Sequence, residues 1–421
     1  MKDTVAIIGG GIAGLTAAYL LNEKYDITLF EKNGRLGGNA HTYRTHDGID
    51  VDIAVAAFGL AGYKNFYRLL DELKVKTSLC ATSYMSMRDL DTGRGIYLTP
   101  LSLEGILAQR FAMFAPKQMK TMADLLLGIR HAKKLLDRGA LDGITLREAF
   151  GKFPRLRGDA RLLMMFALCL LSSMYYEEVM ESPARFFIEK LKVHNDVISP
   201  RAVYSVRAVT NKTRSYVEAL ASRFSDRVVL NAKIKTVQRG PGGVTLVLQG
   251  GKKQRYGSVI FACPADDALS LIEKPTPQER QILGAWRYKR GTIVVHRDHA
   301  SFPRKELIQA YTFLYTDRKG KVQTSVNGGL WHEPGVPADC DYISSQHPNF
   351  PIRKDLIEYE TAFKTPIFDF NSCPTIGRLP SLNGVNRSYF CGSHFGYGLH
   401  NDAVTSAIAA ARGLGVEWGR R

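Results

Sequence analysis

The N-terminal pattern of apolar and polar positions predicts a strand, a helix and a second strand. Residues 5–8 form a short apolar run of the kind found in buried parallel strands. Residues 12–21 are mostly small or apolar and predict the helix that follows, and the apolar run within "YDITLFEK" predicts the next strand. This order is typical of a βαβ unit at the start of a parallel sheet.

Three glycines between the first strand and the helix follow the spacing G-x-G-x-x-G: Gly9, Gly11 and Gly14. Gly9 would allow a tight turn, Gly11 would let the backbone approach a pyrophosphate, and Gly14 would let the helix pack on the strand. The free N–H groups at the helix N-terminus would bind negative charge. Glu31 follows the second strand, 22 residues after Gly9, where a carboxylate accepts hydrogen bonds from ribose hydroxyls. A purely structural turn is the alternative, but the strand–helix context favours a dinucleotide site.

The segment "EKNGRLGGNAHTY" favours FAD over a nicotinamide dinucleotide. A second glycine pair, Gly37 and Gly38, leaves room for a cofactor that runs along a second stretch of backbone. Arg35 can neutralise part of its diphosphate. An ordinary turn with a solvated arginine is the alternative for this segment taken alone. Together with the first motif, the segment indicates a tightly held FAD.

These motifs resemble the N-terminus of the flavin amine oxidase and phytoene desaturase superfamily. Residues 387–415, "RSYFCGSHFGYGLHNDAVTSAIAAARGLG", are similar to the segment that closes the FAD site in those flavoproteins, with a helix N-terminus facing the pyrimidine side of the flavin. The segment "DRVVLNAKIKTVQRGPGGVTLVLQ" resembles their strands near the adenine half, and "YGSVIFACPADDALSLI" resembles the strand and turn that return to the FAD domain. The motifs and the resemblance together predict these FAD-binding residues: Gly9, Gly11, Ile12, Ala13, Gly14, Glu31, Lys32, Arg35, Gly37, Gly38, Val229, Gly392, Ser393, Gly398, Asn401 and Asp402.

A narrower resemblance is to the bacterial "predicted NAD/FAD-binding protein" family, often found beside cyclopropane fatty-acid synthase-like methyltransferases. That family includes a flavoprotein desaturase of methylated acyl chains in furan fatty-acid synthesis. The similar segments are "VDIAVAAFG", "WRYKRGTIVVHRDHASFPR" and "FCGSHFGYGLHNDA". The chain departs from the family at its usual V-x-G-G, where it reads "RAVTNKTRSYVEAL". It also has His394 where amine oxidases place a glutamate, and "GTIVVH" lacks the lysine that they place near flavin N5, which weakens an amine-oxidase interpretation.

Length and motif positions predict a discontinuous FAD domain. With 421 residues, the chain can form two sizeable cores. The FAD motifs lie at both ends and in the middle, so we predict an α/β fold whose Rossmann-like, glutathione-reductase-like FAD domain comprises residues 1–78, 206–275 and 366–421. The inserts 79–205, with helical periodicity, and 276–365, with strand-like runs, would form an α+β substrate domain. Substrate would enter between this domain and the flavin.

The formal charge of +17 calls for an anionic partner. No nucleic-acid-binding motif appears and the basic residues are spread out, which argues against nucleic acid. Segment 108–139 interleaves basic residues with aromatic and methionine side chains, as in proteins that dock on anionic membranes; a solvated helix pair is the alternative. These residues are Arg110, Lys117, Lys120, Arg130, Lys133 and Lys134 with Phe111, Met113, Phe114 and Met119.

Six cysteines without metal-like spacing indicate reduced thiols and no metal site, and no signal peptide fits. We therefore expect a cytoplasmic protein, either free or peripheral on the inner face of the membrane, and leave its oligomeric state open.

The longest uncharged stretch, residues 162–176, is shorter than the ~20 residues needed to span a bilayer. A fully buried helix is the favoured interpretation. The alternative is the wall of a long apolar tunnel, in which Met164, Met165 and Met174 would suit a flexible, chain-like substrate.

Candidate catalytic residues lie in "SHFGYGLHND". Tyr397 falls in the turn that the resemblance directs at the flavin ring, and His394 and His400 flank it; each can act as acid or base, or only pack and hydrogen-bond there. Asp402 falls in the first helical turn and would cap it or lie near the flavin. His296 and Asp298 form a second candidate pair. Their spacing would place both on one face of a strand, but it does not show that they meet the substrate.

Three functions fit these features. The first is an FAD-dependent desaturase or oxidase of a lipid acyl chain or similar long apolar substrate, with hydride transfer to flavin N5. The second is a flavin amine oxidase acting on a soluble amine. The third is a flavin-dependent isomerase without net oxidation. In each of them the cofactor supplies the reactive group, and the protein supplies orientation and a dry cavity.

Overall fold

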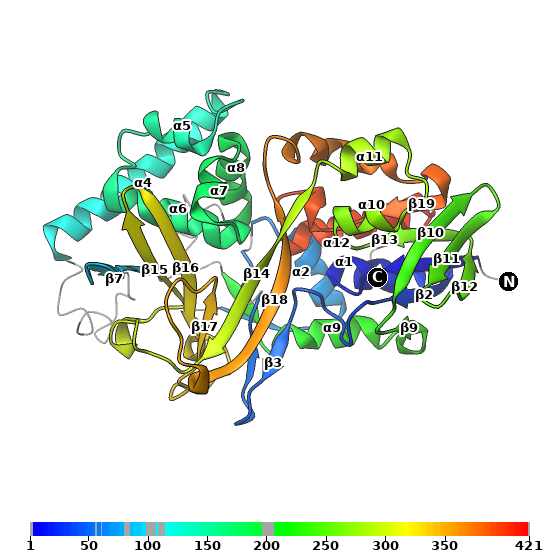
Figure 1. Ribbon diagram of the computed structural model, residues 1–421, viewed down its shortest axis with the longest axis horizontal. Helices are drawn as coiled ribbons and strands as arrows, with labels where there is room; N and C mark the ends of the chain where they lie inside the picture. The colour runs from blue at the N-terminus through cyan, green and yellow to red at the C-terminus, as the bar shows by residue number, and fades with distance from the viewer. Residues whose placement is uncertain are drawn as a thin grey trace.

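The chain is organised around two large sheets of different kinds (Figure 1). The computed structural model describes residues 3–54, 57–59, 61–79, 85–97, 107, 114–195 and 206–419. The first sheet is five-stranded and parallel, in the order β19-β13-β1-β2-β9. Its strands are β1 (Thr4–Ile8), β2 (Asp26–Phe30), β9 (Val228–Val229), β13 (Ser258–Phe261) and β19 (Ser388–Phe390).

The two faces of this sheet are buried against different layers, because successive side chains of a strand point to opposite faces. Val5 and Ile7 of β1 belong to a buried cluster with α1 (Ile12–Leu21), α2 (Lys64–Glu72), α9 (Arg214–Ala221) and α12 (His400–Gly413). Ala6 and Ile8 belong to another cluster. It includes residues of β10 (Ile234–Gly240), β11 (Gly243–Leu248), α10 (Ala265–Leu271) and α11 (Pro277–Leu283), and β12 (Lys253–Tyr256) completes the small sheet of β10 and β11. The predicted α/β fold class, with a Rossmann-like domain, is confirmed.

The second large sheet has seven strands in the order β18-β14-β17-β16-β15-β6-β7. Its strands are β6 (Met85–Asp89), β7 (Gly95–Tyr97), β14 (Arg287–His296), β15 (Tyr311–Arg318), β16 (Lys321–Gly329), β17 (Ile343–Gln346) and β18 (Ile357–Ile367). A group of helices covers one side of it (Figure 1): α4 (Pro116–Asp137), α5 (Leu146–Gly151), α6 (Gly158–Ser172), α7 (Tyr176–Met180) and α8 (Ala184–Asn195). Phe166 of α6 stacks on Phe313 of β15 with ring centroids 5.3 Å apart, which joins the helices to the sheet.

Two short antiparallel strand pairs and seven 3-10 turns complete the described fold. The pairs are β3 (Thr42–Arg44) with β4 (Asp50–Asp52) and β5 (Thr77–Leu79) with β8 (Arg207–Val209). The turns are η3 (Ser225–Arg227), η4 (Lys305–Leu307), η5 (Leu330–His332), η6 (Lys354–Leu356), η7 (Cys373–Leu382), η8 (Val385–Arg387) and η9 (Ser393–Phe395). The predicted domain boundaries stay a prediction; within segment 79–205, the strands β6 and β7 join the second sheet beside the helices.

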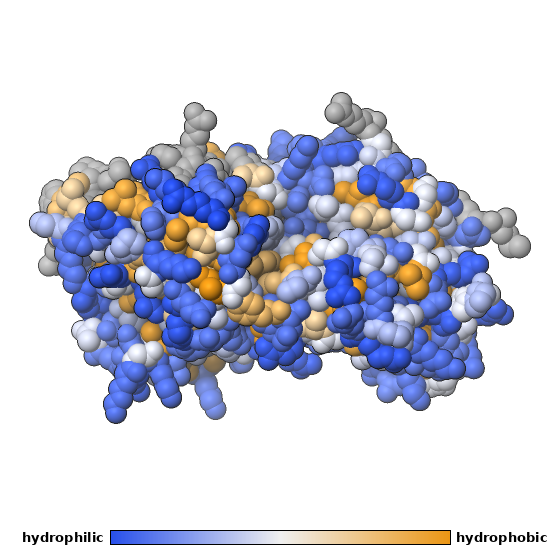
Figure 2. All heavy atoms as spheres, turned by 90° about the horizontal axis from the view of Figure 1, so that it is seen from above, coloured by the Kyte–Doolittle hydropathy of each residue, from blue (hydrophilic) through white to orange (hydrophobic). Residues whose placement is uncertain are grey.

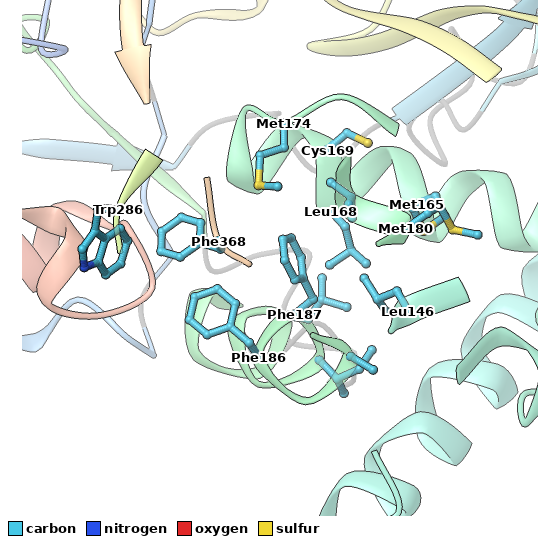
Figure 3. Packing of buried hydrophobic residues seen from close by; sticks show 14 of the residues in the cluster. Leu146, Met165, Leu168, Cys169, Met174, Met180, Phe186, Phe187, Trp286 and Phe368 are labelled. Atoms are coloured by element: carbon cyan, nitrogen blue, oxygen red, sulfur yellow. The ribbon is translucent and has the colours of Figure 1, made fainter. Parts of the chain in front are cut away.

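The apolar stretch 162–176 lies mainly in α6 and is largely buried. Met164, Met165 and Met174 pack in the main hydrophobic cluster, where Figure 3 shows Met165 and Met174 among Leu168, Cys169 and Phe187. The three methionines are therefore core residues, which corrects the tunnel-wall alternative for them. Only the end of the stretch, Leu170 to Ser173, reaches the large cavity described below. In the described part of the chain, no helix has both the length and the apolar character needed to cross a bilayer.

Candidate functional site

A cavity of about 950 Å³ lies where the two large sheets meet, lined by residues of both. It receives the carboxyl ends of β1, β2 and β13 and, from the other side, residues of β14, β16, β18 and α8. Twelve of the predicted FAD-binding residues line it: Gly9, Gly11, Ile12, Ala13, Glu31, Lys32, Arg35, Gly37, Gly38, Gly392, Ser393 and Gly398.

The first glycine turn has the geometry that a dinucleotide requires. Gly9 has φ +115°, and a Cβ there would lie 2.4 Å from the Ala262 carbonyl oxygen, so only glycine fits. A Cβ on Gly11 would meet no atom within 4 Å, because this residue faces the open cavity. Gly14 lies outside the cavity lining, and its Cβ would be 1.9 Å from the Gly9 carbonyl oxygen. Gly14 therefore lets α1 pack on the turn and does not contact the cavity.

The Glu31 carboxylate is buried and fixed by its neighbours. Its Oε2 accepts a hydrogen bond from Gly10 N at 2.7 Å, and its Oε1 accepts from Asn33 N at 2.9 Å and Asn33 Nδ2 at 2.7 Å. These bonds join the glycine turn to the end of β2. Each carboxylate oxygen has two lone pairs, so Oε2 keeps one for a ribose hydroxyl.

Arg35 is a solvent-exposed cation that lines the cavity, and it has no acidic partner among the described residues. Among the described residues it makes one hydrogen bond, from Nη1 to Leu36 O at 3.3 Å, and no ion pair. Burial lowers the pKa of its guanidinium, although Tyr359 and Glu31 act in the opposite direction. Gly37 N donates to Gly10 O at 2.8 Å, which packs the second glycine segment on the first. An unpaired guanidinium beside two glycine turns fits the diphosphate of FAD.

Three further predicted FAD-binding residues, like Gly14, lie outside the cavity lining and support it instead. The Val229 carbonyl accepts from Glu31 N at 2.9 Å. Asn401 Oδ1 accepts from Asn65 N at 2.9 Å and Phe66 N at 3.2 Å, so it caps the start of α2. Asp402 Oδ2 accepts from Leu399 N at 2.8 Å. Burial raises the pKa of the Asp402 carboxyl to about 6, although backbone N–H groups, such as that of Leu399, and Lys190 oppose this rise.

Tyr397 does not occupy the place predicted for it. Its hydroxyl donates to Glu189 Oε2 at 3.1 Å, its ring packs on Phe186 with centroids 5.2 Å apart, and it is not among the residues that line the cavity. The turn continues through Gly398 with φ +83°, and Gly398 itself lines the cavity. The structure therefore contradicts a catalytic position for this hydroxyl.

We expect Tyr397→Phe to retain flavin and nearly all turnover, with a loss of about 1 kcal/mol of stability from one hydrogen bond. Thermal unfolding and flavin absorbance of the purified variant measure both effects. A turnover loss of a hundredfold with unchanged stability would restore Tyr397 as a catalytic candidate.

His394 and His400 do line the cavity, but both are poor bases. Burial lowers the pKa of His394 to about 3 and that of His400 to about 4. His400 Nε2 is also hydrogen-bonded to the Tyr216 hydroxyl at 2.9 Å. The other predicted pair lies outside the lining: His296 Nε2 contacts Ser345 Oγ at 2.8 Å, and Asp298 accepts from backbone N–H groups of Ala300 and Arg353.

Sequence reasoning missed Lys190, a buried lysine of α8 that lines the cavity. Its signal is the helical spacing of "FFIEKLKVH", in which Lys190 shares the buried face with Phe187 and Leu191. A lysine on a buried helical face calls for an explanation, because lysine is rarely fully buried without a partner.

Comparisons with known proteins agree with the dinucleotide-binding geometry of the glycine turns. A family model described as an NAD(P)-binding Rossmann-like domain matches residues 7–73. Cyclohexylamine oxidase from Brevibacterium oxydans superposes with a TM-score of 0.68 at 15% identity, covering 99% of this chain and 100% of that one. Putrescine oxidase superposes with a TM-score of 0.65 at 16% identity, covering 98% and 99%. The chain has the flavin amine oxidase fold.

Other matches extend this picture beyond amine oxidases. A fatty acid isomerase from P. acnes shares the flavin amine oxidase fold with a TM-score of 0.66 at 15% identity, covering 96% of this chain and 97% of that one. A putative flavin-containing monoamine oxidase of Mycobacterium tuberculosis is 24% identical over 295 residues, 66% of this chain. This alignment spans about three fifths of that curated relative, 61% of its length. The matches confirm the predicted resemblance to the superfamily.

Proposed function

We propose that this protein is an FAD-dependent oxidoreductase that removes hydrogen from a long apolar substrate of the acyl-chain type. FAD would be held by the two glycine turns, Glu31 and Arg35, and would supply a hydride acceptor at the junction of the two sheets. The chain's own residues bind the substrate, keep water out and handle the proton.

The charged side chains that line the cavity support an apolar substrate over an amine. Each described carboxylate in the lining has a partner: Glu31 has Gly10 N and Asn33, Asp52 has Thr42 and Thr213, Asp267 has Lys32 and Lys364, and Glu333 has Lys212. Three basic side chains of the described lining, Arg35, Lys190 and Arg290, have no ion pair with the described residues, and Arg35 would be taken up by the FAD diphosphate. Lys190 and Arg290 offer a protonated amine no counter-charge, whereas a neutral acyl chain, or one with an anionic end, is compatible with this lining.

The substrate side of the cavity is also rich in apolar groups. They include Leu170 and Leu171 of α6, Tyr311 of β15, Val326 of β16, Phe363 of β18 and Phe368, which directly follows β18. Such a surface holds a C–H bond in place by packing, and exclusion of water favours hydride transfer over competing reactions. The name of one structural neighbour, a fatty acid isomerase, supports the view that this fold accommodates fatty acyl chains.

Anaerobic bleaching of the flavin tests the proposal. We expect purified holoprotein to lose its flavin absorbance with vesicles of phospholipids that carry monounsaturated or methyl-branched acyl chains, and not with putrescine or cyclohexylamine. Mass spectrometry of the lipid should then show one species lighter by two hydrogens. Bleaching by the amines alone would establish the amine-oxidase alternative. A moved double bond at unchanged mass would establish the isomerase alternative.

We further propose that α4 docks the protein on an anionic membrane. Phe114, just before α4, and Met119, Leu126 and Leu127 on it are exposed, and Arg130 and Lys134 follow on the same exposed side. Figure 2 shows apolar patches among hydrophilic residues on the face seen from above. Lys117 and Lys120 contribute less than predicted, because they pair with Asp159 and Asp124. Arg110, Phe111 and Met113 lie outside the described residues.

Vesicle co-sedimentation tests this docking. We expect the wild type to pellet with phosphatidylglycerol-containing vesicles, and the Leu126→Ser/Leu127→Ser variant to lose about tenfold or more in affinity, since it removes exposed apolar area without touching the core. Equal binding of both proteins, or no wild-type binding, would contradict docking through α4.

A further inference from the structure

Lys190 lies at the substrate side of the cavity, next to the turn that carries Gly398. Its side chain is 1% exposed to solvent, and its Nζ is 4.7 Å from the centroid of the Phe368 ring. A Cβ on Gly398 would lie 3.7 Å from this Nζ, so the amine is adjacent to the turn. Phe186 and Trp286 pack on Phe368 and hold its ring in place (Figure 3).

No described carboxylate lies within ion-pair distance of Lys190, and its amine makes no hydrogen bond to the described residues. Burial lowers the pKa of this amine to about 7, although Asp402 and Cys373 oppose the decrease. His194 lies one turn further along α8 and also lines the cavity. Burial and the nearby Lys190 lower the pKa of His194 to about 4, and its Nδ1 is 3.0 Å from the Tyr63 hydroxyl. A neutral histidine thus leaves the amine as the strongest base in this part of the cavity.

The remaining candidates for a base are weaker or occupied. His394 has a pKa of about 3, His400 is bonded to Tyr216, and Tyr397 is directed away from the cavity. Among the described lining residues, Lys190 combines a cavity position and full burial with a basic nitrogen that bonds to no described residue. A base of pKa near 7 is well matched to proton transfer at neutral pH.

We propose that Lys190 is the catalytic base of this site and accepts the proton that the substrate loses during oxidation. This inference rests on the proposed function. One substrate C–H bond breaks and gives its proton to the Nζ lone pair, which forms an ammonium group. The neighbouring C–H bond breaks with its electron pair, and this hydride passes to oxidised FAD as the two-electron acceptor. The electron pair of the first C–H bond becomes the new C=C bond.

The protonation state of Lys190 can be measured without substrate. Holoprotein is labelled briefly with acetic anhydride at a series of pH values, and peptide mass spectrometry gives the extent of acetylation at Lys190 and at Lys192, the exposed lysine two residues on. We expect half-maximal reactivity of Lys190 near pH 7, with Lys192 as the exposed reference. A Lys190 midpoint equal to that of Lys192 would overturn the proposal, because the amine would then be protonated at neutral pH.

Variants separate a base from a structural lysine. With the bleaching lipid as substrate, we expect Lys190→Met and Lys190→Arg to slow flavin reduction by about a hundredfold or more, and Lys192→Met to leave it unchanged. Lys190→Ala should regain rate when methylamine is added, with a dependence on the neutral amine. A structural role would show neither this rescue nor the failure of arginine.

The outcomes distinguish this inference from the proposed function. If lipid bleaches the flavin equally fast in the wild type and in Lys190→Met, the function stands and Lys190 is not the base. If no lipid bleaches the wild type, the proposed function fails, and acyl-chain deprotonation by Lys190 fails with it. Retention of flavin and of the unfolding temperature in Lys190→Met excludes misfolding as the cause of a slow rate.

Discussion

Gly11→Val yields a folded protein that has lost its FAD: this is the expected result of adding a side chain at the centre of the first glycine turn. Gly11 has φ −75°, which valine also adopts, and a Cβ there meets no protein atom within 4 Å. The new side chain would instead project into the cavity, where the diphosphate must approach the backbone most closely. We expect FAD affinity to fall about a hundredfold or more, equivalent to about 2.7 kcal/mol. Absorbance of the purified protein and titration with added FAD measure the loss.

Gly14→Ala is the matched control for this prediction. The smaller alanine Cβ would lie 1.9 Å from the Gly9 carbonyl oxygen, so this variant should unfold at lower temperature even without cofactor. Gly11→Val should unfold at the temperature of cofactor-free wild type. If Gly11→Val retains FAD with wild-type affinity, the cofactor does not pass over this turn, and the assignment of the cavity to FAD is wrong.

Most of the predicted residues that line the cavity are those whose geometry is local. The spacing of Gly9, Gly11 and Gly14 fixes the shape of one turn, whichever distant residues pack around it. Glu31 is the next position along the same βαβ unit, so its approach to Gly10 also follows from local order. Of the twelve predicted FAD-binding residues that line the cavity, nine lie in this N-terminal segment, between Gly9 and Gly38.

The direction of side chains in the closing turn was not predictable from sequence. Tyr397 and Gly398 are adjacent, yet only Gly398 lines the cavity, because Glu189 of α8, 208 residues earlier, accepts the tyrosine hydroxyl. Asn401 likewise caps α2 through a contact that spans 336 residues. Lys190 was missed because its place in the cavity becomes apparent only when α8 packs beside Phe368 and Gly398. Such contacts depend on how the two sheets meet, and no local pattern records this.

A buried ion pair joins Arg239 of β10 to Glu279 of α11. The second large prediction is that Glu279→Ala destabilises the folded protein. Arg239 of β10 donates to both oxygens of Glu279, at 2.6 and 2.9 Å, and also to Ser388 Oγ of β19 at 3.0 Å. The two side chains are 3% and 1% exposed. Removal of the carboxylate leaves the Arg239 guanidinium buried without a counter-charge, and we expect a loss of about 3–5 kcal/mol. Urea unfolding of the FAD-saturated protein measures it.

The pH dependence of stability gives an independent check on this pair. Burial alone would raise the pKa of the Glu279 carboxyl, but hydrogen bonds from Arg239 and from Thr276 N outweigh burial and hold the pKa below its usual range. A lowered pKa in the folded state stabilises the protein above the unfolded pKa, near 4.5, and this contribution disappears as the pH falls through the folded value. We therefore expect Glu279→Ala to differ most from wild type at neutral pH and to approach it in acid.

Two comparison variants decide whether the ion pair or the packing is responsible. Glu181→Ala removes one acidic partner of Arg147 on the surface, and we expect it to cost no more than about 1 kcal/mol. Arg239→Met/Glu279→Met replaces both charges by apolar side chains, and it should recover most of the stability that Glu279→Ala loses, because no buried charge then remains unpaired. The double variant and Glu279→Ala both lack the capping of α11 by Glu279 and the packing of the Glu279 side chain against β10. If the two variants are equally unstable, the loss of stability arises from these contacts and not from an unpaired charge.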